Sequence, residues 1–493
     1  MGLFDRQEFD ELYVVSDLHL GGEKRVETNF QIFDQGVLLE AFLKKLSQET
    51  QKKVGLVING DTVDFLAEPR ATHFDPKGAA DRLERIFQDP SFVPVWRGLE
   101  TFLKAPNRRL AITLGNHDLE LALPWVRERL IEKLSGGDAS VRGRIALSLD
   151  GTGFRCQVGG ARVLCVHGNE ADNWNATDYE KLRRITRDLI WGQNFDGWET
   201  NAGTRLVIEV MNDVKRLYPF IDLLKPQTEA AVPILLLLDP SLARKLDEIC
   251  GLAILSRTKG WREVGFLGAG EAAPEPVELM PGQALATVLR RSFRASTADP
   301  VPRLLEEAEE RRRARETGAR LPAAEAAEFL GTGGAIWAAI SGKDPSEIMR
   351  EALERLKNDP TFDLTRRDKW VQELDELVGT EVNFLLAGHE HLERALARRS
   401  GSGYYYNSGT WARLIQLTPE MLDDETRFAR VFHALKAGTM PALDAEEGLV
   451  ISRPTVVCIW KEGNSVHGEL RRAEMKGAAV SLEPVPQSRH TWQ

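Results

Sequence analysis

Histidine, aspartate and asparagine residues gather in five short blocks of this sequence, and such side chains bind metal ions or move protons. The blocks, with their residues of interest, are SDLH (Asp17, His19), NGDTVD (Asp61, Asp64), GNHD (Asn116, His117, Asp118), VHGNEAD (His167, Asp172) and GHEH (His389, His391). Imidazole, carboxylate and amide ligands without a thiolate suit Mn, Fe, Zn or a similar divalent ion rather than Cu(I) or an iron–sulfur cluster. The blocks therefore predict a metal centre with mixed nitrogen and oxygen ligands.

The spacing within the blocks supports this prediction. Asp17 and His19 are two residues apart at the end of an apolar run, and His389 and His391 repeat this spacing. Alternate residues of a strand point to the same side, so we expect each pair to reach one ion together. A lone histidine beside a strand is more often an ordinary core or surface residue. Five of the nine histidines fall in these blocks, however, and packing alone does not explain that.

The elements that must position these blocks are short β-rich runs separated by helical stretches. The runs are Tyr13–Val15, Val54–Ile58, Leu110–Leu114, Arg162–Val166, Asn383–Ala387 and Tyr404–Trp411, followed by a hairpin of Thr455–Trp460 with Ser465–Arg471. Helices are expected at Leu38–Leu46 and Phe92–Leu103. This alternation predicts an α/β fold, with the chemistry on loops at the carboxyl ends of the strands.

In this order, the blocks D-x-H, G-D-x-x-D, G-N-H-D, H-G and G-H-x-H resemble the signature of the calcineurin-like metallophosphoesterases. The resemblance covers residues 11–172 and 383–471. It implies an α/β fold in which a β-sandwich is flanked by helices in four layers, α/β/β/α. It also implies a hydrolase that cleaves a phosphodiester, pyrophosphate or phosphomonoester bond with a hydroxide bridging two metal ions.

The resemblance implies roles for nine residues. The first ion would be held by Asp17, His19 and His391 together with a bridging Asp61, and the second site would be completed by Asn116, His167 and His389. His117 would protonate the leaving group and Asp64 would orient His117. The alternative for Asp64 is a simple acid at a helix N-terminus. The expected cofactors are two divalent ions, Mn²⁺ first, with Fe, Zn or Co as alternatives.

Details of the blocks narrow the family. Protein phosphatases of the superfamily carry Arg after the second Asp of the GD block and end the third block in Glu, whereas this chain has Phe65 and Asp118. DNA-repair nucleases of the fold usually have His at the position of Asp64. The segments SDLHLGG, HGNEADNWN and YYYNSGTW resemble the group related to UDP-2,3-diacylglucosamine hydrolase, which carries Arg where this chain has His117. We therefore expect a relative with a different substrate.

The chain is expected to leave the core, form a long helical excursion and return. The predicted parts are a first core segment at 11–174, a helical insert at 175–380, a second core segment at 381–478 and a loose tail at 479–493. Within the insert, Gly265–Pro281 reads as a loop and Arg303–Arg320 as a solvated charged helix. The insert is expected to be a cap that shapes the substrate pocket or a platform that binds a partner.

Three features next to the blocks have two interpretations each. The basic and aromatic segment Lys215–Pro226 could line a pocket, although helix packing is the simpler account. Asp172 and Asn175 could contact the substrate or a nearby water, or they could cap the first helix of the insert.

Composition limits the remaining function classes. The chain has 493 residues and a formal net charge of −10, which disfavours general nucleic-acid binding. Its four cysteines, Cys156, Cys165, Cys250 and Cys458, are scattered, which indicates a reducing compartment. We find no secretory signal and no transmembrane segment, and we expect a cytoplasmic protein that acts on a small phosphorylated substrate. The alternatives are an interaction module that keeps metal while its insert recruits a partner, and a nucleotide-sugar or lipid pyrophosphatase; the oligomeric state is not predicted.

Overall fold

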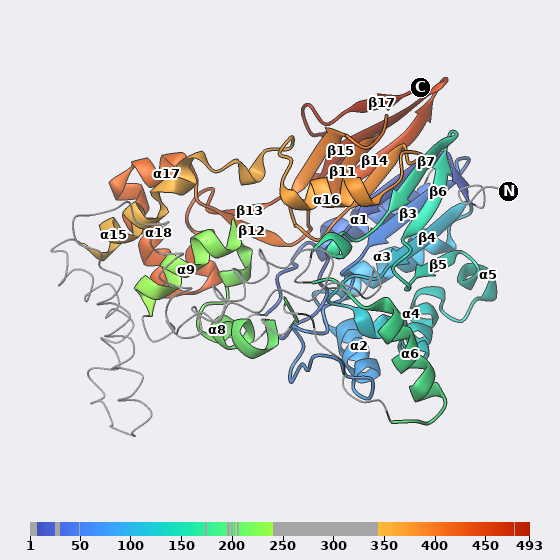
Figure 1. Ribbon diagram of the computed structural model, residues 1–493, viewed down its shortest axis with the longest axis horizontal. Helices are drawn as coiled ribbons and strands as arrows, with labels where there is room; N and C mark the ends of the chain where they lie inside the picture. Colours follow the sequence, from blue (N-terminus) through green and yellow to red (C-terminus); the bar gives the residue numbers. More distant parts are fainter. Residues whose placement is uncertain are drawn as a thin grey trace, which may run out of the picture. The chain divides into compact units, whose positions relative to one another are not determined.

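The chain folds into two compact units, which we describe separately (Figure 1). The computed structural model describes residues 7–24, 30–48, 50–172, 175–194, 198, 201, 203–204, 207–239, 344–477 and 479–493. The first unit comprises Met1–Ile208, Phe362–Arg413 and Ser452–Gln493, and the second Glu209–Thr361 and Leu414–Ile451. None of the helices in these described stretches combines the length and the apolar composition that a membrane span requires.

A large mixed sheet of eight strands forms the centre of the first unit, in the order β16-β15-β14-β2-β3-β4-β5, with β17 beside β15. Its strands are β2 Glu11–Val15, β3 Val54–Asn59, β4 Arg108–Thr113, β5 Ile145–Ser148, β14 Thr455–Glu462, β15 Ser465–Lys476, β16 Ala479–Pro484 and β17 His490–Trp492. β2 to β5 run parallel, and β14 joins β2 antiparallel. β3 is buried at every position, as expected for a parallel strand that is covered on both faces.

A six-stranded sheet packs face to face on the first one. Its order is β1-β6-β7-β9-β11-β10, with β1 Glu8–Phe9, β6 Phe154–Val158, β7 Ala161–Cys165, β9 Phe384–Ala387, β10 Glu393–Ala397 and β11 Tyr404–Ser408. Apolar side chains of both sheets form one core between them, including Leu12, Val14, Val57, Val457, Val163, Phe384, Leu386 and Tyr406. The layers therefore form a β-sandwich.

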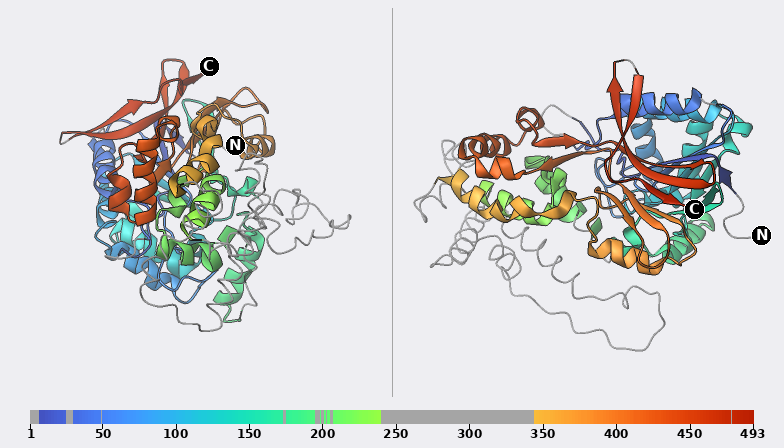
Figure 2. Two further views of the ribbon diagram at one scale, coloured as in Figure 1. Left: turned by 90° about the vertical axis from the view of Figure 1, so that its left-hand side faces the viewer. Right: turned by 90° about the horizontal axis from the view of Figure 1, so that it is seen from above.

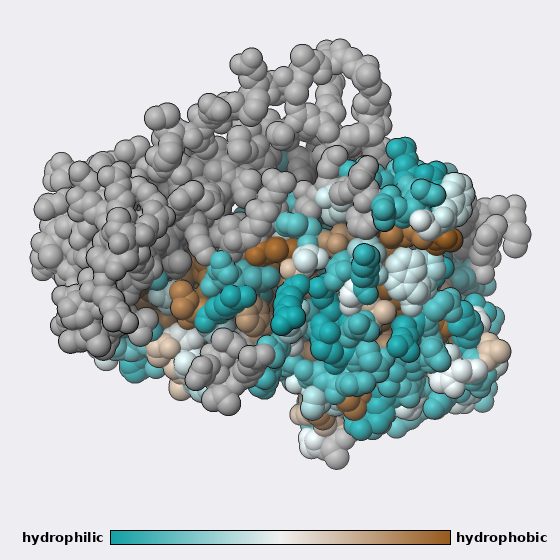
Figure 3. All heavy atoms as spheres, turned by 90° about the horizontal axis from the view of Figure 1, so that it is seen from below, coloured by the Kyte–Doolittle hydropathy of each residue, from teal (hydrophilic) through white to brown (hydrophobic). Residues whose placement is uncertain are grey.

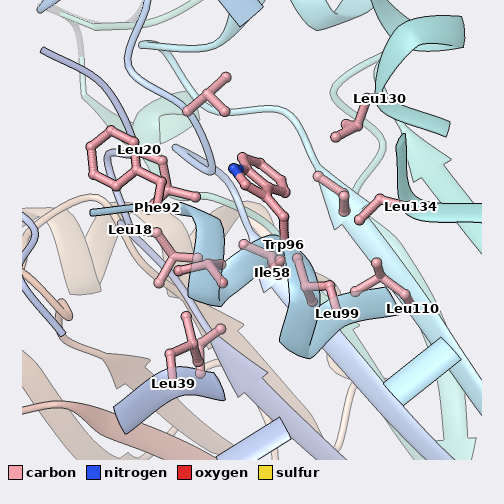
Figure 4. Close-up of a cluster of buried hydrophobic side chains, with 14 of the residues drawn as sticks. Leu18, Leu20, Leu39, Ile58, Phe92, Trp96, Leu99, Leu110, Leu130 and Leu134 are labelled. Carbon is pink, nitrogen blue, oxygen red and sulfur yellow. The ribbon is translucent and has the colours of Figure 1, made fainter. Parts of the chain in front are cut away.

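Helices cover the outer faces of this sandwich (Figure 2). They are α1 Gly36–Gln48, α2 Ala79–Gln88, α3 Val93–Lys104, α4 Pro124–Ser135, α5 Ala139–Arg142, α6 Tyr179–Ile190 and α16 Lys369–Leu377, with short turns η1 Leu119–Ala122, η2 Asn169–Ala171 and η9 Pro360–Phe362. Figure 4 shows Trp96 of α3 packed among apolar side chains of the parallel strands and of α4. On the six-stranded sheet, Asp375 of α16 binds Arg398 at 2.8 Å. The predicted α/β fold is confirmed.

The second unit is mainly helical. Its described elements are η3 Val207–Met211, α8 Asn212–Leu217, η4 Ile221–Leu223, β8 Leu224–Lys225, α9 Gln227–Leu238, α15 Pro345–Leu353, η8 Glu354–Asn358, β12 Arg413–Gln416, α17 Pro419–Asp423, α18 Glu425–Ala437, α19 Met440–Asp444 and β13 Val450–Ser452. A small sheet, β13-β12-β8, joins its two segments, and Ile415 pairs with Leu224. In Lys215–Pro226, Phe220 is fully buried and the Lys215 ammonium pairs with Asp222. These contacts agree with the packing account of that segment.

The two units differ from the predicted insert in their bounds. α6 and α16 lie within the predicted insert, yet they pack on the first unit, where Leu182 and Ile185 of α6 join the helix-covered core. Conversely, residues 414–451 were predicted as core and belong to the second unit. The pairing of β12 with β8 explains this difference, because it ties a late segment to the excursion. The predicted features Gly265–Pro281 and Arg303–Arg320, and Cys250, lie outside the described residues.

The predicted loose tail is wrong. Strands β16 and β17 both pair with β15, and Val480 and Val485 are buried. Pro484 and Ser488 suggested a loop, but Pro484 only ends β16, where a strand tolerates proline. The Ser488 hydroxyl donates to the carbonyl of Val485 at 2.7 Å and is buried. The last residues therefore belong to the sandwich.

The coloured residues on the face shown in Figure 3 are mostly hydrophilic, with apolar ones scattered between them. Among the described residues, the large exposed apolar side chains are Val37, Val93, Trp125, Ile190, Trp191, Leu217, Leu377 and Met475. Single apolar side chains of this kind are normal on a protein surface and need no partner.

Candidate metal centre

Five loops that carry the predicted ligands meet at one end of the sandwich. Each loop follows the carboxyl end of a strand: Asp17 and His19 follow β2, Asp61 follows β3, Asn116 follows β4, His167 follows β7, and His389 and His391 follow β9. β2, β3 and β4 belong to one sheet and β7 and β9 to the other. The packing of two sheets thus brings together residues that are far apart in the sequence.

Asp17, His19 and His391 form the first group of candidate ligands. One ligand atom from each lies within 4.8 Å of the other two. The Nε2 atoms of His19 and His391 are 3.0 Å apart, and the Nε2 atom of His391 is 3.4 Å from Oδ1 of Asp17. Two ring nitrogens at this distance need a proton or a cation between them. These three residues are therefore arranged around a common point.

Asp61, His167 and His389 form the second group, again with ligand atoms within 4.8 Å. Nδ1 of His167 donates to the backbone carbonyl of Asn59 at 2.9 Å. This hydrogen bond fixes the tautomer and leaves Nε2 of His167 for a metal ion. That Nε2 atom lies 3.2 Å from Oδ2 of Asp61.

Asp61 lies between the two groups. Its Oδ2 atom is 3.2 Å from Nε2 of His167 and 3.6 Å from Nε2 of His19. Its Oδ1 atom accepts a hydrogen bond from the backbone N–H of His117 at 2.8 Å. One carboxylate therefore faces ligands of both groups.

The backbone at these positions has an unusual conformation. Asp17, His19, Asp61, His389 and His391 have φ values of 53°, 48°, 49°, 71° and 62°, which is the left-handed region. Side chains at such positions do not alternate as they do in a strand. Asp17 and His19 therefore come together for a reason other than the predicted one, since β2 ends at Val15. The prediction that His389 and His391 reach one ion together is wrong, because the two side chains belong to different ligand groups. Left-handed non-glycine residues are strained and cluster at functional sites.

The electrostatics of the site favour cations. Burial raises the pKa of the Asp17 carboxyl, but its hydrogen bond with His391 and the charge on His167 outweigh burial and lower the pKa to about 2. Burial lowers the pKa of His167, but Asp61 outweighs burial and raises it to about 10. The Asp17 carboxyl is thus ionised, and the His167 imidazole is protonated when no metal is bound. A metal ion can replace that proton, because metal binding to such ligands releases protons.

Two further observations fit a metal. Among the described residues, Oδ1 of Asn116 is buried and makes no hydrogen bond, and buried Nε2 of His167 has an ion-pair contact with Asp61 but no hydrogen bond. Buried polar atoms without partners are rare and point to an ion or a water molecule. In addition, glycine allows close approach: a Cβ atom at Gly115 would lie 2.1 Å from Oδ1 of Asp61, and one at Gly388 would lie 2.5 Å from Oδ2 of Asp17. The site therefore fits divalent ions held by nitrogen and oxygen.

His117 and Asp64 lie next to the first group. Nδ1 of His117 is 3.1 Å from Oδ1 of Asp64, and Nδ1 of His19 is 3.2 Å from Oδ2 of the same carboxylate. Asp64 also accepts from the backbone N–H of Ala67 at 3.0 Å. The alternative interpretation of Asp64 as an acid at a helix N-terminus is wrong, because the next helix, α2, begins only at Ala79. One oxygen of Asp64 accepts within a local turn, and both oxygens face histidines.

Several residues that support the ligand loops had no role in the sequence analysis. Asn407 donates to the carbonyl of Gly388 at 2.6 Å, and the Thr410 hydroxyl donates to the carbonyl of Asp17 at 2.8 Å. Asp118 accepts from the backbone N–H groups of Gly115 and Thr62 at 2.7 and 2.8 Å. Asn407 and Thr410 lie within the quoted YYYNSGTW segment. Asn407 lies near the end of β11 and Thr410 follows it, so polar residues at this strand end were the available signal.

The comparison with known families agrees with this geometry. The family model described as calcineurin-like phosphoesterase matches residues 11–216, which include the loops from Asp17 to His167 but not His389 and His391. No curated protein matches the chain. Together with the convergent ligand loops, the match supports assignment of this chain to the calcineurin-like phosphoesterase superfamily, and with it a metal-dependent hydrolysis of phosphoesters in general.

Proposed function

We propose that this chain uses two divalent ions, Mn²⁺ first, to hydrolyse a phosphodiester, pyrophosphate or phosphomonoester bond. The observation that supports this most is the pair of ligand groups that share Asp61 between them. Asp17, His19 and His391 would hold the first ion, Asn116, His167 and His389 the second, and Asp61 both. When bound, two such ions lower the pKa of a water molecule and neutralise charge on the phosphate oxygens.

The chain itself would supply position and a proton. His117 would donate a proton to the leaving oxygen from Nε2, the nitrogen opposite the one that faces Asp64. The Asp64 carboxylate would keep the other proton on Nδ1 and stabilise the charged ring. Since Asp64 also contacts His19, one carboxylate would align the proton donor with a ligand of the first ion.

Within the superfamily, we place this chain near the group related to UDP-2,3-diacylglucosamine hydrolase, with a substrate of its own. The segments SDLHLGG and YYYNSGTW support the grouping. His117 occupies the position at which that hydrolase carries Arg, which supports different chemistry at the leaving group.

The test is a metal-dependent assay with three substrate classes. The purified chain is stripped of metal, checked by elemental analysis and assayed with a nitrophenyl phosphodiester, a nitrophenyl phosphomonoester and a nucleotide-sugar pyrophosphate. We expect no turnover without metal and a return of activity on adding Mn²⁺. Full activity of the stripped protein would disprove the proposal. Tight binding of two ions without turnover of any class would favour the interaction module instead.

A further inference from the structure

Asp172 and Asn175 are outside the proposed ligand set, yet they connect two of its members. Nε2 of His389 is 2.9 Å from Oδ2 of Asp172. Nδ2 of Asn175 donates to the same oxygen at 2.5 Å, and Nδ2 of Asn116 donates to Oδ1 of Asn175 at 3.5 Å. The three hydrogen bonds form a chain from His389 to Asn116. Both ends of this chain are proposed ligands of the second ion.

The direction of each hydrogen bond follows from the chemistry of the groups. An ionised Asp172 can only accept, so Nε2 of His389 carries a proton and Nδ1 keeps its lone pair when an ion is bound. Asn175 donates through Nδ2 and therefore accepts through Oδ1. Asn116 must then donate through Nδ2, which leaves its Oδ1 atom, buried and without a hydrogen bond in the described part of the chain. Both ends thus keep a lone pair for a metal.

Asn175 is held from several sides. Its backbone carbonyl accepts from the side chains of Asn169 at 3.0 Å and Asn201 at 3.3 Å. Gly203 leaves room for it, since a Cβ atom there would lie 1.9 Å from Oδ1 of Asn175. A side chain held in this way can fix the orientation of its neighbours.

Helix capping does not account for these two residues. The first helix after them, α6, is capped by Asp178, whose side chain accepts from the backbone N–H of Lys181 at 2.9 Å. Asp172 is 6% exposed, and its carboxylate faces His389 rather than a helix end. Burying a carboxylate is costly unless it is hydrogen-bonded, so the chain of contacts gives Asp172 its stability there.

We propose that Asp172 and Asn175 are positioning residues for the second ion, which fix the ring of His389 and the amide of Asn116 with their lone pairs towards the metal. This inference rests on the metal centre proposed above. Residues that orient metal ligands change metal affinity or activity by about 10–100-fold when they are replaced. The affinity for the first ion does not depend on this chain of contacts.

The variants separate positioning from general stability. Asp172→Ala and Asn175→Ala should lower the affinity for the second ion by about 10–100-fold. Asp172→Asn keeps an oxygen that can accept from His389, so its affinity for the second ion should fall less. Gly203→Ala should displace Asn175 and resemble Asn175→Ala. The controls are Asp178→Ala, which removes the cap of α6, and Gly379→Ala, where a Cβ atom would meet nothing within 4 Å.

The measurement is a calorimetric Mn²⁺ titration of the full-length, metal-stripped chain, with folding checked by circular dichroism. We expect two ions in the wild type and in both controls, and selective loss of the second ion in the variants. A wild type that binds no Mn²⁺ would overturn both the proposed function and this inference. Two ions in the wild type with an unchanged second ion in the variants would overturn the inference alone. Equal weakening of the binding of both ions, or weaker binding of the second ion in Asp178→Ala, would show a structural role and would also overturn the inference. If Asp172→Ala does not fold, the second-ion affinities of Asp172→Asn and Gly203→Ala test the inference instead.

Discussion

Both oxygens of the Asp61 carboxylate have a defined surrounding. Oδ1 accepts from the backbone of His117, while Oδ2 faces His167 and His19. These contacts hold the carboxylate in one orientation, which agrees with its proposed role as a bridge between two ions. Its position between the groups suits the separation of roughly 3.5–4 Å that two-metal catalysis requires.

Asp61→Ala should therefore be the most damaging change of a single ligand. We expect loss of activity together with loss of bound metal, because both ions lose a ligand and the buried histidines lose their counter-charge. Elemental analysis and the phosphodiester assay check this. Asp150→Ala, in an exposed turn, is the control. A variant with two ions per chain and near wild-type turnover would contradict the bridging role.

His117→Ala should separate proton transfer from metal binding. His117 is absent from the two proposed ion sites, so the metal content should stay near normal. General acid catalysis contributes about 10²–10⁴-fold, and poor leaving groups such as alkyl esters should lose activity by that order. Nitrophenyl esters, whose leaving group needs little protonation, should lose much less. Equal losses on both would argue against the acid role; His433→Ala, exposed on α18, serves as the control.

At the scale of elements, most of the central strands could be predicted because they are local apolar runs. β2, β3, β4, β7, β9 and β11 lie where the sequence predicts strands, and the ligands follow because polar residues sit at their ends. The left-handed conformations after β2 and β9 could not be predicted, because Asp and His adopt this conformation much less readily than glycine does. The support of Asp17 by Thr410 also could not be predicted, because it depends on where β11 lies in the sheet.

The turn η1 after β4 contains a buried acid that makes the stability of the fold depend on pH. Glu120 is 2% exposed, and its Oε1 atom accepts from the backbone N–H of Asp75 at 3.1 Å. Burial raises the pKa of this carboxyl to about 7, against the opposing effect of hydrogen bonds. The folded state therefore keeps a proton that the unfolded state loses near pH 4.5. Stability falls as the pH rises from there to about 7, and the full penalty remains above that.

Glu120→Gln should remove this penalty and keep an acceptor for Asp75. We expect the variant to be more stable than wild type at pH 8, by roughly 2–3 kcal/mol at most, and little different at pH 4.5. Urea unfolding of metal-free protein at both pH values measures the difference. Glu128→Gln, which is exposed on α4, is the control and should show no such pH dependence. An equal effect of Glu120→Gln at both pH values would contradict the argument.

At the scale of the whole molecule, the chain leaves its first unit twice. Residues 209–361 and 414–451 together form the second unit, and the pairing of β12 with β8 joins these two segments. The sequence suggested one excursion because helical periodicity is local, whereas the pairing of Ile415 with Leu224 is not. The role of the excursion as a substrate cap or partner platform stays a prediction.

Two deletions should behave differently. Removal of 175–380 also takes α6 and α16, which uncovers the apolar core that Leu182 and Ile185 of α6 cover and removes the Asp375 partner of Arg398. We expect that product to be insoluble, since a large uncovered apolar surface promotes aggregation. Removal of 209–361 together with 414–451, each replaced by a short linker, takes no proposed ligand and should give a folded protein that binds two ions. If this second product keeps the substrate preferences of the full chain, the excursion does not select the substrate.

The contact between His19 and His391 joins residues that are 372 positions apart, and this has a consequence for biosynthesis. While the protein is being translated, the ribosome releases the loops from Asp17 to His167 first. At about 5–20 residues per second, His389 follows only roughly 10–45 seconds later. During that time the nascent chain holds five of the seven proposed ligands. The proposed metal centre can therefore be completed only after His391 has been synthesised, and a premature stop codon between residue 216 and His389 would yield a product with the whole matched segment but without two of the proposed ligands.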